Sequence, residues 1–177
     1  MDQDRNSNET NEDNKVTPLH PERNQEETNE NGVTEVQQQH LEAFQAFLVE
    51  KGIPMEAREN ETHVFFMTQE KTPAGAEPMM MIVFSKTTTD VELFARTVTH
   101  VPDGVEDLPI LNAINDFNQE FKYFRVVLDS DRDVTIASTI DLDHGFNPAA
   151  IFGHSVMMFQ ASDEVYAYLT KLYDQIQ

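Results

Sequence analysis

The chain has 177 residues, the length of one ordinary domain with some additional chain. It carries 32 acidic and 12 basic residues, a formal net charge of -20, and no cysteine. Without cysteine, disulfides, thiolate nucleophiles, iron–sulfur clusters and zinc sites with sulfur ligands are excluded. An acidic surface repels phosphate backbones and anionic lipid headgroups, so we expect binding neither to nucleic acid nor to a membrane. The same charge also favours solubility.

Residues 1–33 differ in composition from the rest of the chain. They are rich in Asn and Glu, and their only aliphatic side chains are Val16, Leu19 and Val33. Such a segment buries too little apolar surface to offset the entropy lost on ordering the backbone. We therefore predict a disordered acidic tail over 1–33 and one folded domain over 34–177. The polar start of the tail does not fit a signal peptide, and the absence of a long apolar run predicts a cytoplasmic protein.

A first helix is predicted to begin at Thr34, which forms a capping box with Gln37. An apolar stripe at helical spacing follows, and Gly52 and Pro54 mark the end of the helix. The stripe consists of Val36, Leu41, Phe44, Phe47 and Leu48.

Strands are then predicted at residues 55–58, 62–68, 78–85 and 91–98, with turn residues between them. The stretch 55–58 carries the weakest strand pattern of the four.

A second helix is predicted over 106–120, where Leu108, Leu111, Ile114 (or Asn115) and Asn118 recur at helical spacing. Two strands, 123–129 and 133–141, are joined by a short polar turn and form a hairpin. Asn147 and Pro148 then signal the start of a third helix that runs to about residue 176. Gly153 and the pair Ala161–Ser162 leave open whether this helix is continuous, bent or divided.

These elements predict an α+β fold with three helices and a mostly antiparallel sheet of five to six strands, in the order α-β-β-β(-β)-α-β-β-α. Val64 and Phe66 alternate with Phe65 and Met67, and residues 79–84 are apolar at every position. Both faces of these strands therefore favour burial, and three helices rarely cover both faces of such a sheet. We expect a homodimer that covers the second face.

The order of helices and strands resembles the YbjN family over residues 34–177. The specific part of the resemblance is 111–142, where the stretch 111–118 (LNAINDFN) places Asn115 and Asn118 at the family's paired asparagine positions. The resemblance implies a fold similar to type III secretion chaperones, no assigned enzymatic activity, and a role as a bacterial sensory transduction regulator that binds other proteins. The acidic tail is a departure from the family pattern. Independently of the family, asparagines three residues apart share one helix face and can bond the backbone of the following strand.

Metal chemistry has one candidate in the sequence. Asp129, Asp131 and Asp133 repeat at the spacing of a calcium loop, but Val134 and Ile140 occupy the positions where that loop needs Gly and Glu. We interpret the three aspartates as an acidic hairpin tip.

Acid–base chemistry also has one local candidate, the cluster of Asp141, Asp143 and His144. We interpret it as the turn before the third helix, with a hydrolase as the weakest alternative. Gly153-His154-Ser155 does not form a nucleophile elbow, and 6 glycines leave little material for a phosphate-binding loop.

The sequence thus predicts no catalytic, cofactor-binding or metal-binding residue and no cofactor. The leading hypothesis is a non-enzymatic, cytoplasmic module that acts by contact with a protein partner that the sequence does not identify. The alternative is a small-molecule-sensing domain with a cleft between helix and sheet. Met79–Met81 and Met157–Met158 fit core or dimer packing, with a client-binding patch as the second interpretation.

Overall fold

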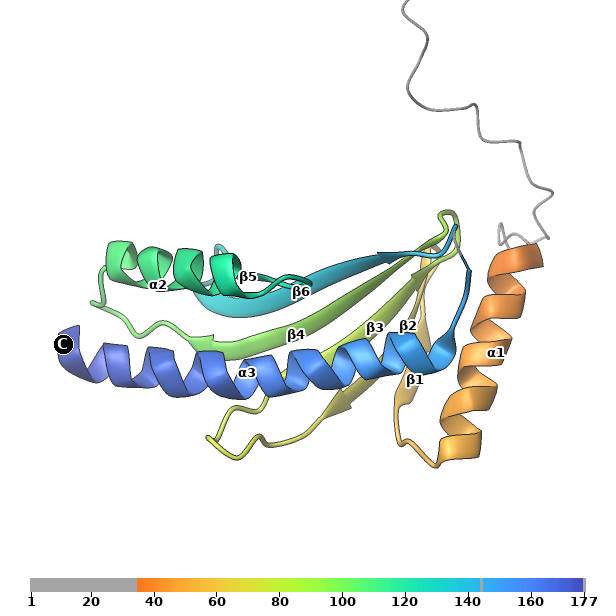
Figure 1. Cartoon of the computed structure of the whole chain (residues 1–177), viewed down its shortest axis with the longest axis horizontal. Helices are drawn as coiled ribbons and strands as arrows, with labels where there is room; N and C mark the ends of the chain where they lie inside the picture. The colour runs from red at the N-terminus through yellow and green to blue at the C-terminus, as the bar shows by residue number, and fades with distance from the viewer. Residues whose placement is uncertain (1–34, 144, 177) are drawn as a thin grey trace, which may run out of the picture.

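The computed structural model describes residues 35–143 and 145–176 (Figure 1). It shows an α+β fold with three helices and one six-stranded antiparallel sheet, which confirms the predicted fold class and element order. The strand order in the sheet is β1-β2-β3-β4-β6-β5. The elements are α1 (Glu35–Lys51), β1 (Glu56–Glu59), β2 (His63–Gln69), β3 (Met79–Ser85), β4 (Asp90–His100), α2 (Asp107–Glu120), β5 (Arg125–Leu128), β6 (Asp133–Asp141) and α3 (Pro148–Ile176). The predicted tail over 1–33 lies outside the described residues.

All three helices pack on the same face of the sheet, and α3 runs along it from the α1 end to the α2 end (Figure 1). Alternation along the strands supplies the core, because every second side chain points toward the helices. Phe66 on β2, Ile82 on β3 and Leu93 on β4 face one another across the sheet and are buried. We call this the core face.

Helix α1 is anchored at both ends. At its start, the Gln37 side chain is buried and donates a hydrogen bond to the backbone oxygen of Thr88. Farther along, the Phe44 ring packs against Phe84, with ring centroids 5.2 Å apart. Its end is a left-handed turn at Gly52 (φ 64°), a backbone conformation that glycine adopts without a steric penalty. The predicted capping box needs Thr34, which lies outside the described residues.

Helix α2 lies where it was predicted, but of the residues whose spacing indicated it only Ile114 is buried. Leu108 and Leu111 are 67% and 48% exposed, whereas the buried side of the helix is formed by Ile110, Ala113, Ile114 and Phe117. Both sets recur at helical spacing, so periodicity alone did not choose between them. Packing against β5 and α3 selects the side that buries the Phe117 ring.

Helix α3 is one continuous element of 29 residues, which answers the question that Gly153 and Ala161–Ser162 had left open. Its start is capped as predicted, because the Asn147 side chain accepts the backbone N–H of Ala150 at 3.1 Å. Inside the helix, the Ser162 hydroxyl donates to the Met158 carbonyl at 2.8 Å and stays fully buried without interrupting the helix. Among the described helices, none combines the length and the apolar composition that crossing a bilayer requires.

Candidate functional site

The face of the sheet opposite the helices carries a row of apolar side chains. Met67 on β2, Met81 on β3, Phe94 on β4 and Ala137 on β6 are consecutive partners across the sheet, and all four are half-buried. None of them belongs to the core cluster or packs against it. We call this surface the open face, defined by Phe65, Met67, Met79, Met81, Val83, Glu92, Phe94, Arg96, Thr135 and Ala137.

A shallow hollow of about 400 Å³ lies on the open face, with Val83 and Thr135 only 4% and 8% exposed at its floor. Val127 on the edge strand β5 is 41% exposed and forms part of the rim. Most of the exposed lining is apolar, so a partner in this hollow would make mainly apolar contacts rather than hydrogen bonds to a set of converging polar groups.

Two opposite charges flank the centre of the open face. Glu92 and Arg96 lie on β4, two residues before and two residues after Phe94, and all three side chains point to the same face. Neither Glu92 nor Arg96 makes an ion pair with another described residue, although the chain has an excess of acids. Both charges are therefore available to a binding partner.

The methionine run divides between the two faces. Met80 is 5% exposed in the core, whereas Met79 and Met81 are half-buried on the open face. In the second pair, Met158 is fully buried and Met157 is 42% exposed. Core packing thus accounts for one residue of each run, and the remaining methionines stay accessible from outside the fold.

A second hollow, of about 560 Å³, lies where α2 leads into β5 and contains the nearest approach to catalytic geometry. The Ser138 hydroxyl lies 3.1 Å from His154 Nε2, but it donates its proton to the Tyr123 carbonyl at 2.9 Å. Burial lowers the pKa of His154, and a hydrogen bond from the imidazole to the Tyr123 backbone carbonyl partly opposes this effect. No described carboxylate orients the imidazole, so the contact ties β6 to α3 rather than activating the serine.

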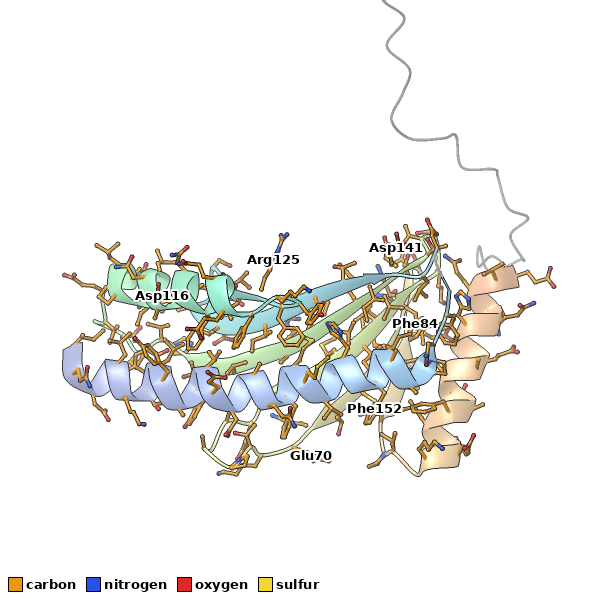
Figure 2. All side chains as sticks on the ribbon, in the orientation of Figure 1. Glu70, Phe84, Asp116, Arg125, Asp141 and Phe152 are labelled. Atoms are coloured by element: carbon orange, nitrogen blue, oxygen red, sulfur yellow. The ribbon has the colours of Figure 1, made fainter. Side chains whose placement is uncertain are left out.

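Sequence reasoning missed this Ser138–His154 contact, because it joins residues on different elements with no local pattern. The same hollow carries Lys122 and Arg125, and Figure 2 shows Arg125 extending away from β5 toward solvent. Asn118 and Ser138 are engaged within the fold, so the hollow offers a ligand two exposed cations and the hydroxyls of Tyr123 and Thr139.

The paired asparagines have different roles. The Asn118 side chain accepts the Val126 N–H at 2.8 Å and donates to the Val126 carbonyl at 3.0 Å, so it holds the backbone of β5 as predicted. Asn115 is exposed, and its side chain makes no hydrogen bond with a described residue. Because the backbone N–H and carbonyl of Val126 point away from β6, Asn118 occupies the outer edge of the sheet.

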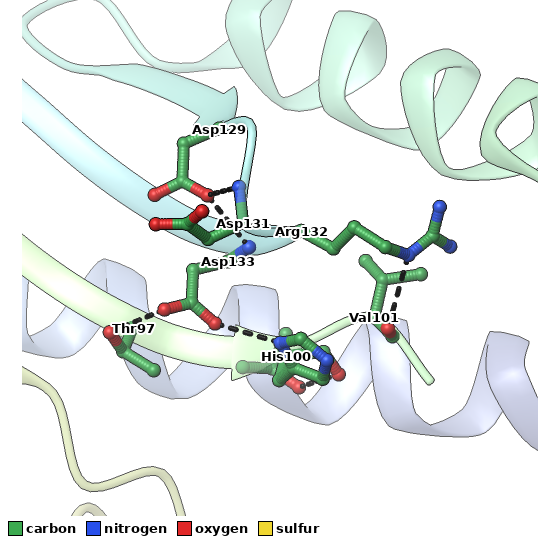
Figure 3. A network of polar contacts seen from close by, with 8 residues as sticks. Thr97, His100, Val101, Asp129, Asp131, Arg132 and Asp133 are labelled. Atoms are coloured by element: carbon green, nitrogen blue, oxygen red, sulfur yellow. Dashed lines mark hydrogen bonds and ion pairs between the residues drawn. The ribbon is translucent and has the colours of Figure 1, made fainter. Parts of the chain in front are cut away.

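The acidic hairpin tip uses its carboxylates internally (Figure 3). Asp129 Oδ1 accepts the backbone N–H groups of Asp131 and Asp133, each at 2.9 Å. Asp133 in turn accepts the Thr97 hydroxyl at 3.0 Å and lies 2.9 Å from His100 Nδ1. Within residues 35–143 and 145–176, no group of three or more His, Asp or Glu is placed to hold a metal ion.

In the predicted turn before α3, two aspartate side chains accept hydrogen bonds from within the fold. Asp141 Oδ1 accepts the Asp143 N–H at 2.8 Å, and Asp143 accepts the Thr89 hydroxyl at 2.6 Å. His144, the base of the weakest hypothesis, lies outside the described residues. The two carboxylates thus serve the turn, as their interpretation in the sequence required.

A third hollow, of about 140 Å³, lies between α3 and the sheet, where the small-molecule hypothesis expects a cleft. Met80, Phe152 and Phe159 supply apolar walls, and Thr68 and Glu70 lie at its polar side. Its volume corresponds to about five water molecules, so it would admit only a small ligand.

No protein-family model, curated protein or solved structure matches this chain. The resemblance to the YbjN family therefore stays a prediction that rests on residues 111–142.

Proposed function

We propose that this chain is a non-enzymatic protein-binding module with a regulatory role, and that the open face is its contact surface. The observation that carries the proposal is the row Met67, Met81, Phe94 and Ala137, which is apolar, half-buried and not covered by any described element. The resemblance to YbjN proteins and type III secretion chaperones supports the same class of function. The cysteine-free composition supports a cytoplasmic location.

Physical reasons favour a protein over a small ligand at this surface. Contiguous apolar patches rimmed by charges mark protein contact sites, because burying them releases ordered water. Full burial of a Phe or Met side chain contributes about 1.5–3 kcal/mol, so a few such side chains can drive association. Methionine adapts its shape to a partner at low cost in strain.

Mild peroxide oxidation of the native, dilute protein tests the accessibility that the proposal requires. Met67 and Met81 should be oxidised clearly faster than Met80 and Met158, because the first two are half-buried at the surface and the other two lie in the core. Peptide mass spectrometry reads each methionine separately. If Met81 were as well protected from oxidation as Met80 at every dilution, the open face would be inaccessible in the monomer and the proposal would be refuted.

The alternative is a small-molecule sensor that uses the hollow between α3 and the sheet, and the lining by Phe152, Phe159 and Met80 is the observation that favours it. It expects a rise in melting temperature with some metabolite pool. The variant Phe159→Ala should abolish that rise, whereas Phe94→Ala on the open face should keep it.

A further inference from the structure

We infer that the partner of the open face is a second copy of this chain, packed face to face about a two-fold axis that crosses the strands at the level of Phe94. This inference rests on the proposed function, because it assumes that the open face is a protein contact surface. It adds the identity of the partner and the orientation in which the two sheets meet.

The charges on β4 select this orientation. Two sheets packed face to face keep their strands within about 30° of one another, which leaves two ways to place a two-fold axis between them. An axis parallel to β4 would set Glu92 against the partner's Glu92 and Arg96 against the partner's Arg96. An axis across the strands sets Glu92 against the partner's Arg96 and Arg96 against the partner's Glu92, so every central charge meets its opposite.

The monomer cannot satisfy these charges by itself. Glu92 and Arg96 are four residues apart on one strand, which separates their backbones by roughly 13 Å. Both lack an ion-pair partner in the described part of the chain. A second copy in the inferred orientation supplies one partner to each of them and forms two symmetric ion pairs.

The apolar side chains match in the same orientation. The row Met67, Met81, Phe94 and Ala137 lies on the axis, so each of these residues meets its own copy. Val83, one row away, meets the partner's Met79, which lies one row away on the other side. These central matches are apolar on apolar, while Phe65 on β2 meets the partner's Gln69. Methionine at three positions lets the two rows interdigitate around the Phe94 rings.

Charged side chains outside this centre lie at the rim. Arg58 and Glu56 on the edge strand β1 already form an ion pair at 2.8 Å, and Arg125 is exposed on the opposite edge strand. Glu56 and Arg125 continue the axis row beyond Met67 and Ala137, so each approaches its own copy at an edge of the sheet, where both side chains are exposed and salt and water screen the like charges. The ion pairs that decide the orientation are the central ones.

Charge reversal tests the inference, because the two-fold axis places residue 92 of each copy opposite residue 96 of the other. Glu92→Arg alone sets two cations together at both central pairs, since the introduced guanidinium meets the partner's Arg96. Arg96→Glu alone sets two acids together at both pairs. Each variant should dimerise about 100-fold or more weakly than the wild type. An equimolar mixture of the two variants should recover dimers, because every central pair is again of opposite sign.

Sedimentation velocity over micromolar concentrations measures these masses, and recovery in the mixture shows that both variants are folded. Lys171→Glu on α3 is the control, since it reverses a charge remote from the open face and should leave dimerisation unchanged within about twofold. A monomeric wild type, single variants that dimerise as tightly as the wild type, or a mixture that stays monomeric would each overturn the inference.

Oxidation of Met81 separates failure of this inference from failure of the proposed function. If a second copy covers the open face, Met81 is oxidised quickly in dilute solution and becomes protected as the concentration rises. A monomer whose Met81 stays reactive at every concentration refutes the second copy and keeps an open face for a different protein. A Met81 that is protected even in the dilute monomer refutes the proposed function itself.

Discussion

Asn118 closes the outer edge of β5 with one side chain, since its amide bonds both the N–H and the carbonyl of Val126. We expect Asn118→Ala to lower the free energy of unfolding by about 1–2 kcal/mol, because two hydrogen bonds are lost at a partly buried strand. Urea unfolding measures the change. Asn115→Ala, one turn earlier on the same helix, is the matched control and should stay within about 0.5 kcal/mol of the wild type. Equal effects of the two substitutions would show that the bonds to β5 contribute nothing.

His40 links stability to pH at the scale of one residue. Its ring stacks on Phe146 with centroids 4.4 Å apart, and its buried Nδ1 makes no hydrogen bond with a described residue. Burial lowers the pKa of His40 below the ordinary value of 6.5, so the unfolded chain takes up the proton first as the pH falls. The stabilisation is therefore complete above about pH 6.5 and is lost as the pH falls from there toward the folded pKa.

We expect His40→Phe to keep the ring stack while removing this titration. The free energy of unfolding should then fall less steeply than in the wild type between about pH 7 and pH 5, with a slope difference of at most about 1.4 kcal/mol per pH unit. Urea titrations at several pH values measure both slopes. His154 titrates in the same direction and remains in the variant, so some slope persists. Identical slopes would contradict the assignment to His40.

At the scale of elements, Arg132 fastens the β5–β6 hairpin to the segment that joins β4 to α2. Its guanidinium donates to the Val105 carbonyl at 2.8 Å and to Asp107 at 2.5 Å, and its backbone carbonyl accepts the Val101 N–H at 2.9 Å. Figure 3 shows the side chain reaching from the hairpin tip toward Val101. The clamp holds α2, and with it Asn118, over the edge of the sheet.

Arg132→Ala should therefore cost about 2 kcal/mol of unfolding free energy, because the buried Val105 carbonyl loses its charged donor. Thermal and urea unfolding both report the loss. Lys171→Ala removes an exposed cation without an ion pair in the described chain and should change stability by less than about 0.5 kcal/mol. If Arg132→Ala left the stability unchanged, the pairing of β6 with β4 alone would hold the hairpin in place.

The order of elements could be predicted because each turn and cap acts locally, as at Asn147 and Gly52. The open face could be predicted as well, since Phe65 and Phe66 demand burial on opposite sides of one strand. The buried side of α2 could not, because two stripes of equal period compete and only the packed sheet chooses. The role of Glu92 and Arg96 could not be predicted either, because only the strand register places both charges on one face beside Phe94.

The charge of the whole molecule opposes the association that its open face favours. Each chain carries a formal charge of -20, so two copies repel one another over distances that salt controls. The Debye length is about 30 Å at 0.01 M salt and about 8 Å at 0.15 M, so moderate salt screens the surface charges far more than the partly buried pairs of Glu92 with the partner's Arg96.

We therefore expect the dimerisation constant to rise between about 0.01 M and 0.15 M NaCl, which sedimentation equilibrium measures directly. The mixture of Glu92→Arg and Arg96→Glu chains should follow the same trend, because its two substitutions cancel in net charge. If the association constant of the dimer fell steadily as salt is added, the electrostatic attraction between the two open faces would exceed the repulsion between the net charges at every salt concentration. The central ion pairs would then contribute affinity in addition to setting the orientation of the two sheets.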